Sequence, residues 1–421
     1  MAHSRYRSKT VPVLAAFLLC VITMPALADP GDTLGVGWAG RGRTGAAVAG
    51  VHDYSAAYYN PGAAIGQRPA VSISLLHVIS GLSPETADTS EGSFLEAGAI
   101  LPLLKRKGLP QIWFSLAAMT PTSGFYEMNL PDDEDTSFAL YNSREERLLL
   151  TAAIAIQVHP SLSLGVGLEM LPTVDAAVAL DVTDSTGVND LAVTVGYRLS
   201  PTAGIHWNPL DWLKAGLSWR AENHSSLDLP VDVKAGGVDL SATVNAKTFF
   251  VPHRFTAGVE AGLGKRFAVE LDVTWYHYGA FPSPAADVSM YSTSGEDTLG
   301  TTLADPELGH RFSPALAVSY TRPELQLQAG YRYSPTAFPE PAGITNLLDN
   351  DTHTWALGFR LPLLESPETP RMLALTGNFF AAWMPERRVF KKQVLVGNPG
   401  YPDISFGGYR LGLALGAEVE F

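Results

Sequence analysis

The sequence predicts an all-β protein, a transmembrane antiparallel β-barrel of about 14 strands with an N-terminal plug in its lumen. Three observations lead to this prediction. Short runs of alternating apolar and polar residues fill most of the chain, the connections between them alternate in length, and aromatic residues gather near the ends of the runs. A period of two is typical of strands that have one apolar and one polar face.

The first 28 residues have the three parts of a secretory signal peptide. Basic residues lie within the first nine positions, an apolar run extends from Val11 to Val21, and Ala26-Leu27-Ala28 is a small-residue cleavage site. The apolar run is shorter than the ~20 residues of a membrane-spanning helix. We therefore expect residues 1–28 to be a signal peptide, and the mature chain to start at Asp29.

The composition of the mature chain excludes several classes of function. The only cysteine, Cys20, lies in the signal peptide, which excludes disulfides, thiolate metal sites and cysteine nucleophiles. Of 29 basic residues three lie in the signal, so 26 remain against 42 acidic residues, a net charge of −16. Nucleic-acid binding requires a basic surface, and this chain is acidic.

The alternating runs are clearest at the C-terminus. Within residues 411–421 every odd position is apolar, and every even position is small or acidic. An even number of strands is typical of bacterial outer-membrane barrels. The sequence contains about fourteen such runs, which begin near residues 69, 92, 110, 147, 161, 189, 211, 238, 265, 309, 324, 352, 371 and 404.

The connections and the aromatic residues support a barrel in the outer membrane. Short connections such as Asn208–Asp211 alternate with long ones such as Thr120–Glu146 and Tyr278–Leu308. Transmembrane barrels have short turns at the periplasmic rim and long loops at the extracellular rim. Aromatic residues at strand ends, including Trp275 and Trp355, favour the membrane–water interface.

The N-terminal part of the mature chain does not follow the strand pattern. A barrel of about 14 strands is too wide for strand side chains alone to fill. Residues 29–68 are rich in glycine and alanine, which allow the backbone to pack closely in a confined space. We therefore expect residues 29–68 to form a plug and residues 69–421 to form the barrel.

This segment resembles a known family. The stretch GRGRTGAAVAGVHDYSAAYYNPGAAI resembles the N-terminal hatch of the FadL-type long-chain fatty-acid transporters (OMPP1/FadL/TodX), and two later stretches, VPHRFTAGVE and LLDNDTHTWALGF, resemble other segments of that family. Gly62 replaces the alanine that the family usually has. The hatch motif is carried by Gly45, Asp53, Ser55, Asn60, Pro61 and Gly62.

The resemblance implies a monomeric barrel that takes up hydrophobic compounds, above all long-chain fatty acids, by passive diffusion and without a cofactor. It also implies lateral release through an opening at a kinked third strand, which by position is Gln111–Thr120. Three alternatives remain open: a diffusion porin for small polar solutes, an aromatic-hydrocarbon channel of the same family, and a surface barrel whose long loops bind or adhere.

Alternation also identifies candidate contacts for a ligand carboxylate. It turns Arg198, Arg220 and Arg332 toward the lumen, where cations are natural partners of a carboxylate. The competing interpretation is that lumenal arginines pair with acids of the wall, because an unpaired buried charge is costly. Glu270, Asp272 and Glu418 are the acids expected to do so.

Other motifs give no support for catalysis or metal binding. Gly35-Val-Gly37-Trp-Ala-Gly40 matches the dinucleotide fingerprint but lacks the strand and helix that give it meaning. The histidines are scattered without a ligand spacing, and no serine and histidine pattern indicates a hydrolase. Asp349 and Asp351 are interpreted as turn residues. We therefore expect neither an enzyme nor a metal site.

Overall fold

The computed structural model describes residues 29–421, apart from residues 86, 88, 107, 125–135, 142–145, 182–188, 236–237, 282–285, 293–296, 303–307, 339–346, 366–371 and 392–399. Short helices come first in the chain: α2 (Pro30–Leu34), α3 (Trp38–Gly42), α4 (Ala56–Tyr59) and the 3₁₀ turn η1 (Pro61–Ala64). None of the helices in the described part of the chain is long and apolar enough to cross a membrane.

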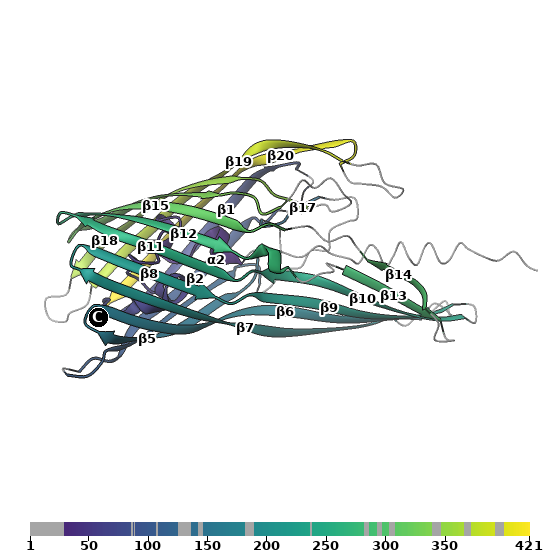
Figure 1. The fold of residues 1–421 in the computed structure, drawn as a ribbon, viewed down its shortest axis with the longest axis horizontal. Helices are drawn as coiled ribbons and strands as arrows, with labels where there is room; N and C mark the ends of the chain where they lie inside the picture. The colour runs from purple at the N-terminus through teal and green to yellow at the C-terminus, as the bar shows by residue number, and fades with distance from the viewer. Residues whose placement is uncertain are drawn as a thin grey trace, which may run out of the picture.

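Fourteen of the described strands close into an antiparallel barrel (Figure 1). Each pairs with its neighbours, and the last strand pairs with the first from Ala70↔Glu420 to Ser83↔Gly407. Closure leaves no unpaired edge facing lipid. The barrel strands are β1 (Ala70–Ser83), β2 (Gly92–Leu104), β3 (Ile112–Pro121), β5 (Leu149–His159), β6 (Leu162–Asp181), β7 (Asn189–Leu210), β8 (Leu213–Arg220), β11 (Arg254–Leu263), β12 (Phe267–Tyr276), β15 (Arg311–Arg322), β16 (Leu325–Ser334), β18 (Thr352–Glu365), β19 (Met372–Phe390) and β20 (Asp403–Glu420).

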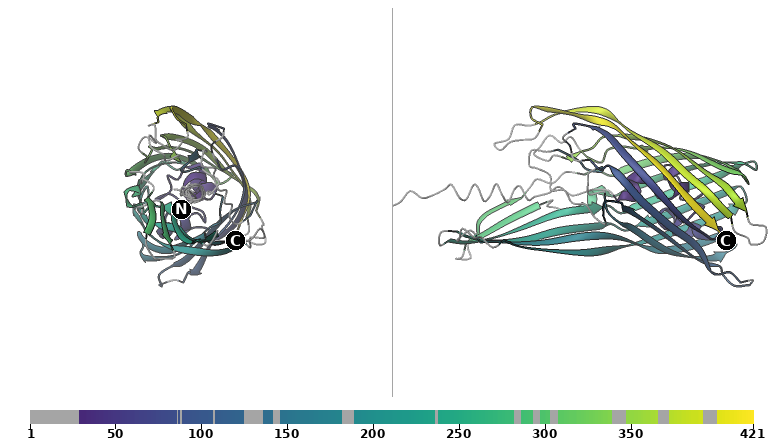
Figure 2. Two further views of the ribbon diagram at one scale, coloured as in Figure 1. Left: turned by 90° about the vertical axis from the view of Figure 1, so that its right-hand side faces the viewer. Right: turned by 180° about the vertical axis from the view of Figure 1, so that it is seen from behind.

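At the end with the long loops, a sheet projects beyond the barrel (Figures 1 and 2). It is built on the outer halves of β6 and β7, which are 20 and 22 residues long. Strand β9 (Asn223–Ala235) pairs in parallel with β6, and β10 (Val238–Val251), β13 (Ala286–Ser292) and β14 (Asp297–Thr302) follow in order.

The projecting sheet corrects one strand of the sequence prediction. A barrel strand was expected to begin near residue 238, but Val238 begins β10, and the barrel wall continues with β11 from Arg254. The connection 278–308, expected to be a loop, contains β13 and β14. Side chains alternate in any strand, so periodicity could not distinguish a strand of the wall from a strand outside it.

The outer and lumenal faces of the barrel wall carry the residues that the alternation in the sequence predicts. On β20, Leu413, Leu415 and Val419 are about half exposed, whereas Ala414 and Glu418 are buried in the lumen. The outward residues of the other strands are likewise large and apolar. A closed ring with an apolar outer band is the architecture of an outer-membrane barrel.

The wall is continuous at the third strand. Strand β3 pairs with β5 from Ile112↔Ile156 to Met119↔Leu149, and with β2 along its other edge. The opening that the family resemblance implied at Gln111–Thr120 is therefore absent from the described part of the wall, where both edges of β3 are hydrogen-bonded.

Candidate functional site

Residues 29–65, which we call the N-terminal segment, lie inside the ring of strands (Figure 2, left). Almost all of them are buried, including every residue from Trp38 to Val51. A backbone enclosed in this way needs partners for its N–H and C=O groups, because little water can reach it. The wall of the barrel supplies those partners in three ways.

First, glycines on the lumenal face bring wall and segment backbones together. A Cβ atom at Gly204 would overlap with the Asn60 side chain, one at Gly216 with the Val48 carbonyl group, and one at Gly330 with the Arg43 backbone. Small side chains allow two backbones to approach closely. We call the full set the glycine belt: Gly98, Gly165, Gly204, Gly216, Gly330 and Gly358.

Second, wall carboxylates accept hydrogen bonds from the segment backbone. Asp272 accepts from the N–H groups of Ala47 (2.8 Å) and Val48 (2.9 Å). Glu270 accepts from those of Ala49 (2.7 Å) and Gly50 (3.0 Å). These two acids were expected to pair with wall arginines, and they bind the segment instead.

Third, two arginines of the segment form ion pairs with the wall. Arg41 contacts Glu96 at 2.7 Å, and Arg43 contacts Glu260 at 3.0 Å and Glu270 at 2.5 Å. All five side chains are almost fully buried. Loss of one partner would leave an uncompensated charge in the lumen, so these pairs hold the segment in one position.

The residues of the predicted hatch motif organise the segment itself. Asp53 accepts hydrogen bonds from the N–H of Ala39 (3.1 Å) and from both the N–H (3.0 Å) and the hydroxyl group of Ser55, which ties α3 to α4. Burial raises the pKa of Asp53 to about 6, although these hydrogen bonds act to lower it. Gly45 adopts φ 78°, a conformation that favours glycine.

The Asn60-Pro61-Gly62 turn fixes the segment against β7. The Asn60 amide group donates to the carbonyl oxygens of Val48 (2.6 Å) and Ile205 (3.0 Å), and its oxygen accepts from Gly62 N–H (3.0 Å). Pro61 opens η1, and Gly62 packs on the bare backbone of Gly204. The turn is therefore a docking point as well as a change of direction.

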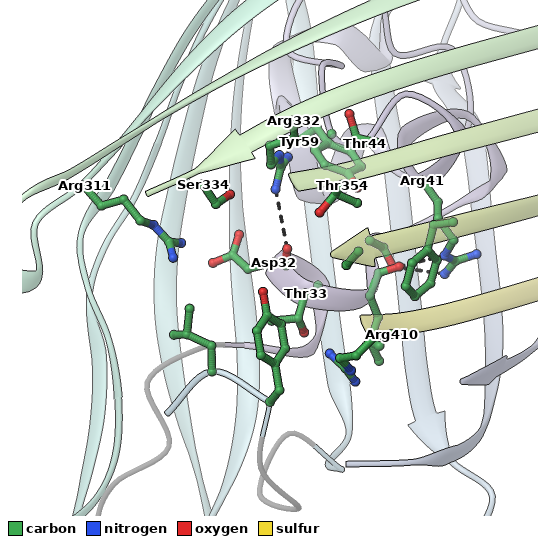
Figure 3. Close-up of a pocket in the computed structure, with 18 residues that line it drawn as sticks. Asp32, Thr33, Arg41, Thr44, Tyr59, Arg311, Arg332, Ser334, Thr354 and Arg410 are labelled. Carbon is green, nitrogen blue, oxygen red and sulfur yellow. Dashed lines mark hydrogen bonds between the residues drawn. The ribbon is translucent and has the colours of Figure 1, made fainter. Parts of the chain in front are cut away.

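A small cavity lies between the segment and the long-loop end of the barrel (Figure 3). The segment forms one side through Gly31–Gly35 and Tyr59, strands β15 to β20 form the wall, and Leu140 and Tyr141 cover it. Its volume is about 50 Å³, which is enough for a few waters or a carboxylate but not for an alkyl chain.

Four arginines surround this cavity: Arg41, Arg311, Arg332 and Arg410. Arg41 is paired with Glu96. Arg311 stacks on Tyr276 at 4.2 Å, and its Nε has no hydrogen-bond partner among the described residues. Arg332 reaches the carbonyl oxygen of Asp32 at 3.5 Å (Figure 3). Within the described part of the chain, neither Arg311 nor Arg332 has a carboxylate at ion-pair distance, so both can accept an anion.

Of the three arginines predicted from the sequence, only Arg332 lines the cavity. Arg220 lies over the ring of Tyr58 at 3.9 Å and pairs with Asp29 and Glu169. Arg198 is exposed on β7, near the projecting sheet. Sequence reasoning missed Arg311 and Arg410, although alternation with buried Ser313 and Ala414 on the same strands would have turned both inward.

The two acidic residues of the first helical turn, Asp29 and Asp32, lie close to several arginines. Burial alone would raise the pKa of Asp32, but Arg254, Arg220 and Arg332 lower it below its ordinary value. For Asp29 burial and the neighbouring Asp32 carboxylate prevail, and the pKa of Asp29 is raised. Among the described residues that line the cavity, the carboxylate of Asp32 thus faces several arginines.

An apolar cluster adjoins the cavity at the long-loop end of the barrel. It includes Phe138 and Leu348, which come from the two-stranded parallel pair β4 (Ser137–Phe138) and β17 (Leu347–Leu348). Leu140 and Tyr141 belong to the cluster and also cover the cavity, so the two are in direct contact. The remaining members are Leu82, Ala87, Ala139, Phe250, Tyr276, Tyr278, Ala337, Phe338, Met384, Val389, Ile404 and Phe406.

The other motifs of the sequence have structural roles. In the dinucleotide-like string, Gly35 is the C-cap of α2, Gly37 is the N-cap of α3, and Gly40 lies within α3. Asp349 accepts a hydrogen bond from the Thr336 hydroxyl and Asp351 accepts one from the Thr336 N–H, so the two acids connect segments that are distant in sequence. Among the described residues no group of three or more His, Cys, Asp or Glu side chains could hold a metal ion.

Solved structures share this fold. A FadL homologue of Pseudomonas aeruginosa matches with a TM-score of 0.56 at 14% identity, over 95% of this chain and 99% of that one. The monoaromatic hydrocarbon channel CymD matches with 0.54 at 14%, over 92% and 97%. The toluene transporter TbuX of Ralstonia pickettii matches with 0.55 at 13%, over 91% and 98%. No family model and no curated protein matches the sequence. These likenesses establish the fold, and at that level they agree with the resemblance seen in the sequence.

We expect Gly204→Ala to destabilise the protein by about 1–3 kcal/mol, because the new methyl group overlaps with Asn60 and forces the turn off β7. Urea unfolding of the purified barrel measures this. Gly262→Ala is the matched control, since its Cβ would have ordinary contacts, the nearest at 3.5 Å. Equal destabilisation by both variants would contradict the docking role of Gly204.

We expect Arg43→Met to cost about 3–5 kcal/mol of unfolding free energy, because Glu260 and Glu270 lose a buried partner. The same variant should raise ion conductance in planar bilayers as the segment loosens. Arg388→Met removes an exposed pair with Asp403 and should change neither quantity. An Arg43 variant with wild-type stability and conductance would refute the anchoring role.

Proposed function

We propose that this protein is an outer-membrane channel for the passive uptake of hydrophobic compounds that carry an anionic head group, above all long-chain fatty acids. The observation that carries the proposal is the order of environments along the lumen. An apolar cluster at the long-loop end leads to a cavity with two arginines, Arg311 and Arg332, that lack carboxylate partners among the described residues.

The chemistry of an amphiphile fits this order. The apolar cluster can solvate an alkyl chain as it leaves the outer leaflet, and the cavity beneath it can take the carboxylate. Charge-assisted hydrogen bonds from guanidinium groups compensate the loss of water around that carboxylate. A bound anion would also provide Arg311 with the partner that its Nε lacks.

The alternative within the same fold is a channel for aromatic hydrocarbons. CymD is named a monoaromatic hydrocarbon channel, and TbuX a toluene transporter. The aromatic residues of the apolar cluster, such as Phe138 and Phe406, favour such compounds. A neutral hydrocarbon has no use for the arginines, however, and this is why we place it second.

A porin for small polar solutes is disfavoured by the contents of the lumen. The N-terminal segment is buried and bonded to strands on several sides of the ring. We propose that residues 29–68 act as a plug that a compound must displace before it reaches the periplasm. The segment would be the movable part and residues 69–421 a fixed, monomeric barrel.

The route by which a compound leaves the barrel depends on which strands the plug separates from when it moves. Release into the periplasm needs the segment to detach from the glycine belt. Lateral release at β3 needs its ladders with β2 and β5 to part first, since β3 is paired along both edges, with a register shift at Pro102/Leu104 in the β2 ladder. We propose detachment of the segment as the first step on either route.

We expect Arg332→Met and Arg311→Met each to weaken binding of palmitate roughly 10- to 150-fold, the equivalent of about 1.5–3 kcal/mol for a hydrogen bond to a charged group. Binding of methyl palmitate, which lacks the charge, should not change. Fluorescence displacement on the detergent-purified protein measures both. Arg198→Met, on the exposed part of β7, is the control and should bind palmitate normally.

Equal losses for palmitate and its methyl ester would show that the arginines only hold the cavity together. Tight binding of toluene that is insensitive to both substitutions would favour the hydrocarbon alternative.

We expect deletion of residues 31–66 to convert a barrel of low ion conductance into an open pore in planar bilayers, because the segment fills the lumen. The rate of uptake of labelled palmitate into cells should then no longer saturate as the palmitate concentration rises. High conductance in the intact protein, unchanged by the deletion, would favour the porin interpretation instead.

A further inference from the structure

Three histidines form a row on the outer surface at the long-loop rim. His253, His277 and His310 precede or follow β11, β12 and β15, next to one another on the lipid-facing side. The rings of His253 and His277 are stacked 6.3 Å apart, and those of His277 and His310 5.1 Å apart. The imidazole rings of His277 and His310 make no hydrogen bond to another described residue.

A row of large aromatic residues lies directly beneath the histidines. Cross-strand pairing places Trp219 beside Phe255, Phe255 beside Trp275, and Trp275 beside Phe312. Phe255 and Phe312 are about half exposed on the outer face. Trp219 stacks on His253, and Trp275 on His277, so the two rows form one continuous ring surface.

The aromatic row also lines an apolar groove of about 640 Å³ in the outer wall. Its rims are Leu164, Val166, Leu217 and Phe255, and its floor is formed by small residues of β6, β7 and β11. Two of those small residues, Gly165 and Gly204, belong to the glycine belt. The Cβ positions of both glycines face the segment, so the hollow on the outside arises where the outward residues are small, at Ala203 and Ala257.

We propose that this surface binds a phosphorylated glycolipid of the outer leaflet, of the lipid A class. An acyl chain would lie in the groove, and the phosphate would accept hydrogen bonds from the imidazole N–H groups of His277 and His310. The aromatic row between them matches the boundary between acyl chains and head group. The inference requires the outer-membrane location but not the identity of the transported compound.

Among the described residues, the carboxylate of Glu222 opposes the phosphate. The Glu222 carboxylate lies 3.5 Å from His253 Nε2 and 3.9 Å from His224 Nδ1, while the Glu222 N–H donates to His253 Nδ1 at 3.1 Å. Glu222 thus contacts both ring nitrogens of His253, so the phosphate would bind the other two histidines. Removal of the Glu222 charge should strengthen binding, whereas removal of the histidines should weaken it. The two kinds of variant therefore test the proposal in opposite directions.

The test uses native mass spectrometry of the full-length protein, delipidated in detergent and titrated with bis-phosphorylated lipid A. We expect one retained lipid. Binding should weaken at least tenfold in the double variant His277→Ala/His310→Ala and for dephosphorylated lipid A, and it should strengthen in Glu222→Gln. Ala257→Trp, which fills the groove from its exposed floor, should also abolish retention.

His353→Ala is the matched control. This histidine lies in the same rim, stacked on Trp355 and hydrogen-bonded to Tyr331 at 2.8 Å, but away from the groove. It should leave lipid binding unchanged. Equal retention of dephosphorylated lipid, equal loss in the His353 variant, or a second copy of the chain in the groove would each overturn the proposal.

Discussion

The structure depends on hydrogen-bond partners for the buried backbone of the N-terminal segment inside the barrel. The N-terminal segment has too few residues in regular helix to pair its own N–H groups, and the lumen admits little water. Wall carboxylates therefore accept those hydrogen bonds, with Asp272 and Glu270 serving four consecutive amides from Ala47 to Gly50. A carboxylate with such partners tolerates a buried position that would otherwise be costly.

This solution imposes a second constraint, on the size of the wall residues. Hydrogen bonds to the wall require the segment to lie close to it, and the glycine belt makes that approach possible. Because β-strand side chains alternate between faces, a glycine removes bulk only on the lumenal side of its own position, and the outer face depends on its neighbours. The outward residues that line the outer groove include the small Ala203 and Ala257, and the large Leu164, Val166 and Ile205 stand around them.

The sequence predicted well wherever one face is apolar and the other polar. It placed Glu418 in the lumen as a partner for an arginine, and Glu418 forms a buried pair with Arg360 at 2.7 Å. It was wrong where alternation continues beyond the membrane, as at β10, because the period is the same there. It named Arg198 as a candidate but could not show that β7 extends 22 residues, so that the Arg198 side chain is exposed and does not line the cavity.

The cavity could not be derived from periodicity, since it combines strand ends that are distant in sequence. Arg311 begins β15, Arg332 lies near the end of β16, and Arg410 is in the middle of β20. Only the stagger of strands around the barrel brings them to one height. We propose that the same geometry couples binding to gating. A cavity of about 50 Å³ can hold a head group, but an attached chain needs more room. That room must come from Leu140 and Tyr141 above or from Gly31–Gly35 below, so a compound that enters fully has to displace the cover or the segment.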